Sequence, residues 1–170
     1  NVGLASGNVL RTRQLPSLDL LVGTTNGIAV SSDAGASWDE LGQRAAFVYS
    51  IAGDPQDPNS LVVGGGGGQA WRPDASGARW RHVGGGLPSA NLIALAVCAN
   101  GALYAAADRA GVWRSTLASP GAWTNAGSAG LANTRLTSLS CDPRSGFLYA
   151  GTNGSGTFLS IDQGANWVPL

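Results

Sequence analysis

The chain of 170 residues contains no lysine, no methionine, one histidine and one glutamate. Ten arginines balance ten acidic side chains, and charged residues make up only 12% of the sequence, against a usual share of about 25%. This neutral balance excludes the basic field that nucleic-acid binding needs. No apolar run approaches the roughly 20 residues required to cross a bilayer. No basic segment followed by an apolar one opens the chain, so a secretory signal is not visible.

Cysteine and histidine, which often ligate metals, are equally scarce. Cys98, Cys141 and His82 show no recognisable metal-ligand spacing, so we expect no metal and no cofactor. Aligning residues 91–97 with residues 135–141 pairs Cys141 with Val97 and leaves Cys98 one position further on. Successive strand residues point to opposite faces. The two thiols are therefore expected to face different ways and to stay unpaired.

Tryptophan, in contrast, recurs with a regular period. Successive members of one set are 42, 43 and 44 residues apart: Trp38, Trp80, Trp123 and Trp167. A period of this length is typical of propellers built from four-stranded blades. Each repeat also contains a short apolar run that ends in small residues, which suits a strand buried on both faces. These runs are Leu20–Thr24, Leu61–Gly65, Leu103–Ala107 and Leu148–Thr152.

The other strands follow from the same repeat. First strands are clear at residues 48–52, 92–97 and 136–141, whereas residues 9–13 must serve in the first repeat although they include Arg11 and Arg13. No segment has a helical period. The five glycines at 64–68 lack the following lysine and helix of a phosphate-binding loop, so they indicate a permissive loop between strands.

A short phrase ends at the tryptophan in the first and last repeats. Both copies read Ser-x-Asp-x-Gly-x-x-Trp. An aspartate there can accept hydrogen bonds from amides one or two residues on, the glycine supplies a positive φ, and the ring buries a large area. We interpret the aspartates as turn braces, because one carboxylate per turn is too few for calcium. The two copies consist of Ser31, Asp33, Gly35 and Trp38, and of Ser160, Asp162, Gly164 and Trp167.

These phrases resemble the Asp-box, or BNR repeat, of sialidases, xyloglucanases, sorting receptors and photosystem assembly factors. The middle copies are degenerate. The second keeps Asp74, Gly77 and Trp80 with one extra residue, and the third has Thr116 in place of the aspartate before Trp123. The resemblance covers the whole chain and implies an all-β propeller of four four-stranded antiparallel blades.

The predicted blades span approximately residues 1–42, 43–85, 86–128 and 129–170 of a single domain. Gly3, Gly86 and Gly130 hold similar positions about 20 residues before the second strands, so residue 1 falls within a linker that would leave a preceding blade. No strand is left over to latch a split blade. Three outcomes stay open: the four blades close alone, two chains form an eight-bladed ring, or the chain is part of a larger propeller.

Three classes of function follow. A non-catalytic scaffold that binds protein or glycan, outside the cytoplasm, is favoured. A glycosidase fragment is an alternative, but Glu40 is the only glutamate, Arg11 and Arg13 are not followed by the Ile-Pro of sialidases, and no catalytic set is recognisable. A self-assembling extracellular structural protein is the third. If the family pattern holds, loops between second and third strands line the channel mouth and offer Asn26, Asp108, Arg109 and Asn153 as ligand-binding residues.

Overall fold

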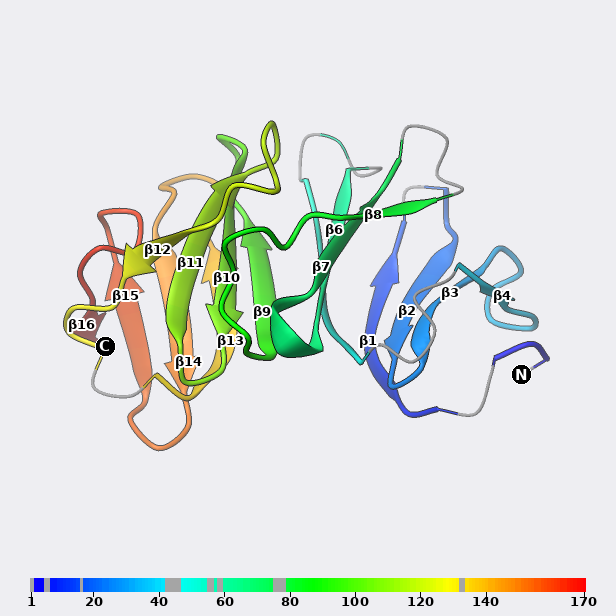
Figure 1. The fold of residues 1–170 in the computed structure, drawn as a ribbon, viewed down its shortest axis with the longest axis horizontal. Helices are drawn as coiled ribbons and strands as arrows, with labels where there is room; N and C mark the ends of the chain where they lie inside the picture. Colours follow the sequence, from blue (N-terminus) through cyan, green and yellow to red (C-terminus); the bar gives the residue numbers. More distant parts are fainter. Residues whose placement is uncertain are drawn as a thin grey trace.

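The structure is a computed structural model, and it describes residues 2–4, 7–15, 17–41, 47–54, 57, 60–74, 79–131 and 134–170. Within them the chain forms four antiparallel sheets of four strands each, in chain order (Figure 1). The prediction of an all-β fold with four blades is confirmed. The only helical turn among these residues is η1 (Gly66–Gly68).

Each sheet is called a blade, numbered along the chain. Blade 1 consists of β1 (Val9–Gln14), β2 (Leu20–Thr24), β3 (Gly27–Ser31) and β4 (Asp39–Glu40). Blade 2 consists of β5 (Val48–Gly53), β6 (Leu61–Gly65), β7 (Ala70–Pro73) and β8 (Trp80–His82). Blade 3 consists of β9 (Leu92–Val97), β10 (Ala102–Ala107), β11 (Gly111–Thr116) and β12 (Thr124–Gly127). Blade 4 consists of β13 (Leu136–Cys141), β14 (Leu148–Thr152), β15 (Thr157–Ser160) and β16 (Val168–Pro169).

The weak first strand of the first repeat forms as predicted. β1 pairs with β2 from Val9 opposite Thr24 to Gln14 opposite Leu20. Arg11 is exposed, whereas Arg13 is half-buried and its Nε atom is buried without a hydrogen-bond partner. The strand therefore accepts its arginines by exposing one and burying the other incompletely.

The glycine run is less of a loop than the sequence predicts. Gly64 and Gly65 belong to β6, and Gly64 pairs with Ala70 of β7. Only the last three glycines form the connecting turn η1, in which Gly67 and Gly68 have positive φ. A Cβ on Gly68 would collide with the carbonyl oxygen of Pro88, so this turn needs glycine for both conformation and space.

The core consists of three layers, one at each junction between successive blades. Leu21 and Ile28 of blade 1 pack with the next blade, Val62 and Ala70 of blade 2 face blade 3, and Tyr104 of blade 3 faces blade 4. Because side chains alternate along a strand, each inner blade presents one face to the blade before it and the other to the blade after it. Leu103 and Ala105 accordingly pack towards blade 2, on the opposite face from Tyr104.

The four blades form an open arc. Blades 1 and 4 lie at opposite ends of the long axis in Figure 1, and no core cluster among the described residues joins them. Of the three outcomes left open by the sequence, closure of these four blades alone is therefore not what the structure shows.

Segments between blades cover the tryptophan of the next blade. The Trp167 amide donates to the carbonyl of Ala129 at 2.8 Å, and the Trp38 amide donates to that of Val2 at 2.9 Å. Gly3, Gly86 and Gly130 have φ between 85° and 87°. A Cβ at any of them would collide with the carbonyl oxygen of the tryptophan beneath it, which explains the recurrence of glycine there. Gly3 thus makes the same contact in blade 1 as Gly86 and Gly130 make in the later blades.

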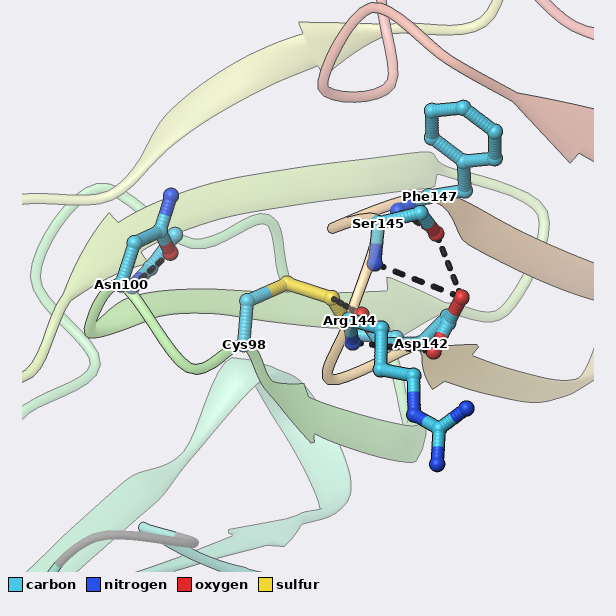
Figure 2. Close-up of a disulfide and its surroundings, with 8 residues drawn as sticks. Cys98, Asn100, Asp142, Arg144, Ser145 and Phe147 are labelled. Atoms are coloured by element: carbon cyan, nitrogen blue, oxygen red, sulfur yellow. Dashed lines mark hydrogen bonds between the residues drawn. A yellow bond between two sulfur atoms is a disulfide. The ribbon is translucent and has the colours of Figure 1, made fainter.

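The cysteine prediction is wrong: Cys98 and Cys141 form a disulfide, with Cα atoms 5.4 Å apart (Figure 2). The two residues do lie on opposite faces of equivalent sheets. Neighbouring blades, however, meet through opposite faces, so an offset of one residue brings the two thiols together. Cys98 faces blade 4 beside Ala96, and Cys141 faces blade 3 from the end of β13.

Candidate functional site

The two turns with the complete Ser-x-Asp-x-Gly-x-x-Trp phrase share the same pattern of hydrogen bonds. In blade 4, Asp162 accepts from the Ser160 hydroxyl at 2.9 Å and from the backbone and side-chain nitrogens of Asn166 at 2.9 and 2.8 Å. In blade 1, Asp33 accepts from Ser31 at 2.8 Å and from the Ser37 amide at 2.8 Å. The aspartates are thus turn braces, but they reach amides four residues on, not one or two as the sequence suggests.

The remaining residues of each phrase complete the turn. The Gly164 amide donates to the Ser160 hydroxyl at 2.9 Å, and the Trp167 indole donates to the Gly164 carbonyl at 2.9 Å. Gly35 and Gly164 have φ values of 92° and 95°. A residue with a Cβ would be strained at either position.

These contacts favour the ionised carboxylates. The hydroxyl and amide of Ser37, together with the Ser31 hydroxyl, lower the pKa of Asp33 to about 2. The side-chain and backbone nitrogens of Asn166 lower the pKa of Asp162 in the same way. A general acid or base works best with a pKa near the operating pH. The two aspartates belong to the β3–β4 and β15–β16 turns, in the blades at opposite ends of the arc. They do not form a catalytic pair.

The degenerate turns show other contacts among the residues that the structure describes. In repeat two, Gly77 and its neighbours lie outside the described residues, Asp74 donates its amide to the Arg79 carbonyl, and the buried Trp80 Nε1 has no partner. In repeat three, Thr116 accepts from the Ser119 amide at 3.1 Å. The Trp123 indole donates to Val83 of blade 2 instead of to its own turn.

The loops between second and third strands, which were predicted to line a channel mouth, lie at the edge of the sheets where each first strand begins, along the lower side of Figure 1. A backbone hydrogen bond joins each loop to the residue that precedes the first strand of its own blade. The Asp108 amide donates to the Asn91 carbonyl and the Asn153 amide donates to the Arg135 carbonyl, both at 2.9 Å. The Arg109 amide crosses to Thr134, on the segment that enters blade 4, at 3.0 Å.

Two of the four predicted ligand-binding residues share one cleft. Asp108 and Asn153 line a cleft of about 370 Å³ at the junction of blades 3 and 4. Asn26 lies on the corresponding loop of blade 1, and neither it nor Arg109 lines the cleft. The other lining residues are Ile93, Arg135, Leu136 and Thr137.

The sequence did not indicate those four residues, because ligand-binding residues were expected only on the loops between second and third strands. Thr137 lies at a register shift in β13, and Ile93 lies at the corresponding shift in β9. A bulged residue leaves the regular ladder and re-aims its side chain. The usable signal in the sequence was position: both residues directly follow the start of a first strand, at the same edge as the loops.

A second hollow accompanies the degenerate turn of blade 3. It has a volume of about 300 Å³ and is lined by Arg114, Ser115, Thr116, Ser119, Ala122 and Thr124. Ser115 and Thr116 are already engaged with Ser119 inside the turn. This hollow is therefore part of the altered turn and offers few groups to a ligand.

Two absences hold for the part of the chain that the structure describes. Its histidine, cysteine and acidic residues nowhere form a group of three that could hold a metal ion. None of its helices is long and apolar enough to span a membrane.

No family model and no curated protein sequence matches the chain. Solved structures do. An ancestral GH74 enzyme matches with a TM-score of 0.80 and 18% identity over 99% of this chain and 26% of its own. The GH74 enzyme of Niastella koreensis matches with a TM-score of 0.75 and 21% identity over 99% and 30%. The extracellular domain of a putative one-component system from B. thetaiotaomicron matches with a TM-score of 0.75 and 17% identity over 94% and 22%. The chain thus has a propeller-like fold and spans less than a third of each of these structures.

Proposed function

We propose that the chain is a non-catalytic propeller module that binds a neutral glycan in the cleft between blades 3 and 4. The observation that carries this proposal is the lining of the cleft. It combines the carboxylate of Asp108, the guanidinium of Arg135 and the amide of Asn153 beside apolar Ile93 and Leu136. Ligand sites are typically 300–1,000 Å³ and combine apolar walls with a few polar groups.

The chemistry of the lining suits hydroxyl groups. A sugar hydroxyl both donates and accepts, so it matches a carboxylate acceptor, a guanidinium donor and an amide that does both. Asp108 and Arg135 carry opposite charges, which leaves the cleft without a strong preference for an ionic ligand. The neutral balance of the whole chain agrees with this choice.

A catalytic role has less support. Canonical glycosidases need two carboxylates flanking the scissile bond, at separations of about 5–10 Å. Among the described lining residues, Asp108 is the only carboxylate. The resemblance to GH74 enzymes supports a glycosidase fragment as the second candidate, but at 18–21% identity it concerns the fold.

An extracytoplasmic location belongs to the same proposal. Structural disulfides persist in oxidising compartments and are rare in the cytosol, and Cys98 is bonded to Cys141. One structural relative is an extracellular domain.

A glycan array, followed by calorimetric titration of the best hit, tests the binding proposal. We expect Asn153→Ala and Asp108→Asn to weaken binding at least about tenfold, since each removes hydrogen bonds to the ligand. Asn26→Ala is the matched control, because it removes the same side chain from a mouth loop outside the cleft. Equal losses in Asn26→Ala and Asn153→Ala, or hydrolysis of an arrayed glycan by the wild type, would contradict the proposal.

A further inference from the structure

Two of the three internal junctions of the arc share one knob-and-hole contact, whereas blade 3 has Ala106 at the position of the glycine. The hole is a glycine on the second strand of one blade. The knob is the apolar residue that begins the first strand of the next blade. Val48 packs on Gly23, where an added Cβ would lie 3.0 Å from the Cβ of Val48. Leu92 packs on Gly64, where the same distance would be 2.9 Å. The knobs Val48 and Leu92 are fully buried.

A hydroxyl group accompanies the hole in blade 2. Ser50 lies opposite Gly64 in the sheet and donates to the Leu92 carbonyl of blade 3 at 2.8 Å. This buried hydrogen bond ties the first strands of two blades together.

Blade 4 carries the same hole with no blade over it. Ser138 lies opposite Gly151 in the register that places Ser50 opposite Gly64. A Cβ on Gly151 would meet the Ser138 hydroxyl, as one on Gly64 would meet that of Ser50. Ser138 is exposed at the end of the arc.

Blade 1 carries the corresponding knob with no blade beneath it. Val9 pairs with Thr24 as Val48 pairs with Gly65 and as Leu92 pairs with Ala107. Val9 is 45% exposed, whereas its counterparts are buried. Trp38, on the same side of blade 1, is only half-buried, although Trp123 and Trp167 are 4% and 3% exposed.

We propose that blade 4 of one copy docks on blade 1 of a second copy and repeats the junction between blades 2 and 3. Val9 of the second copy then packs on Gly151, and Ser138 donates to the Val9 carbonyl. When both ends of both copies dock in this way, two arcs close into an eight-bladed ring with two-fold symmetry. The partner proposed for these faces is a second copy of the chain, and this proposal does not depend on the glycan cleft.

The contact is weaker than the internal junctions. Thr12 and Gln14 stand where blade 3 has Leu95 and Val97, and both are exposed. Less apolar area is buried as a result. We expect reversible association that depends on protein concentration.

The Cα–Cα distance of the native disulfide predicts which residues of two docked copies can be crosslinked. Gln14 holds the position of Cys141, and Asp142 holds that of Cys98, because the Asp142 and Cys98 amides bond to equivalent carbonyls. If the docking is correct, the Cα atoms of residues 14 and 142 in different copies approach about as closely as those of Cys98 and Cys141, which lie 5.4 Å apart.

A chain with Gln14→Cys is mixed with one carrying Asp142→Cys under mild oxidation. The expected product is a crosslink between residues 14 and 142, identified by peptide mass spectrometry, which also reports any exchange with Cys98 or Cys141. The control mixes the Asp142→Cys chain with Ser32→Cys, an exposed position on the Asp-box turn of blade 1. Crosslinking no higher than in this control would overturn the proposal.

Sedimentation of the uncrosslinked chain gives a second readout. The wild-type mass should rise with concentration from 17.1 kDa towards twice that value. Val9→Asp should raise the dissociation constant at least about tenfold, because it buries an unpaired charge. Leu18→Asp, at a 73% exposed leucine, is the control and should leave it unchanged. A wild type that stays monomeric, or a dimer whose dissociation constant is unchanged by Val9→Asp, contradicts the docking. Glycan binding by the Val9→Asp variant should equal that of the wild type.

Discussion

The indole nitrogen of Trp123 lies 2.7 Å from the carbonyl oxygen of Val83, so a blade 3 side chain satisfies a carbonyl just after the last strand of blade 2. Trp123 is also 4% exposed. We predict that Trp123→Phe lowers the free energy of unfolding by about 1–3 kcal/mol, because it leaves the Val83 oxygen unsatisfied. Trp123→Ala should cost about 3–5 kcal/mol through the added cavity. Urea denaturation measures both.

Trp38 provides the comparison for this prediction. It is half-buried, and its indole donates at 3.2 Å to Gly35 within its own turn. Trp38→Phe should therefore cost less than Trp123→Phe in the same assay. The reverse order would show that the contact between blades contributes little.

The Asp33 turn predicts a dependence of stability on acid. Its folded pKa is about 2, below the ordinary value of 3.8, so the folded state favours the ionised carboxylate. This contribution is fully present above about pH 4 and is lost as the pH falls towards 2. Denaturation at a series of pH values, together with carboxyl NMR titration of Asp33, measures it.

Asp33→Asn removes the titrating group and should flatten that part of the pH profile. Asp19→Asn, which alters a carboxylate that accepts a hydrogen bond from Ser17 outside the Ser-x-Asp-x-Gly-x-x-Trp phrases, is the control. An unchanged profile in Asp33→Asn would refute the assignment of the acid sensitivity to this turn.

The disulfide predicts a stability that depends on redox conditions. Cys98 and Cys141 are 43 residues apart, and closing a loop of that length contributes about 4 kcal/mol in the chain-entropy treatment, with observed values usually about 2–4 kcal/mol. Reduction should lower the denaturation midpoint accordingly. The double variant Cys98→Ser/Cys141→Ser should match the reduced wild type and should not respond to reductant.

Two glycines with positive φ, Gly86 between blades 2 and 3 and Gly101 in the β9–β10 turn, allow a matched pair of substitutions. Gly86 has φ of 87° and lies against the Trp123 carbonyl, whereas Gly101 has φ of 77° and no atom within 4 Å of an added Cβ. Gly101→Ala should cost about 1 kcal/mol from the backbone alone. Gly86→Ala should cost at least about 2 kcal/mol, since it adds a collision to the same backbone strain. Equal costs in thermal denaturation would argue against the close approach of the linker.

The sequence was sufficient for the architecture because that information is local and repeated. The period of Trp38, Trp80, Trp123 and Trp167 predicted the blades, and the apolar runs predicted the second strands. Even the weak strand at Val9 formed, since its position was fixed by the strands around it and not by its own composition.

What the sequence could not give was geometry between blades. The prediction that Cys98 and Cys141 point to opposite faces of equivalent sheets was correct. The disulfide nevertheless forms, because neighbouring blades meet through opposite faces. The same limit applies to the cleft: Asp108 and Asn153 were identified as loop residues, but Thr137 reaches the cleft from a bulge in a strand. Self-closure was also left open, because the curvature of the arc is a property of all its junctions together.

The glycine segments that cover each tryptophan shift the true boundaries of the repeat. Residues 129 and 130 follow blade 3 in the chain but complete the turn of blade 4, and Val2 and Gly3 do the same for blade 1. A fragment cut at the edges of a sheet would lose the cover of its own tryptophan and keep the cover of another. Exchange of blades between related proteins, natural or engineered, should therefore succeed when the cut is made upstream of the glycine that precedes each blade. Each exchanged blade then keeps the segment that covers its own tryptophan.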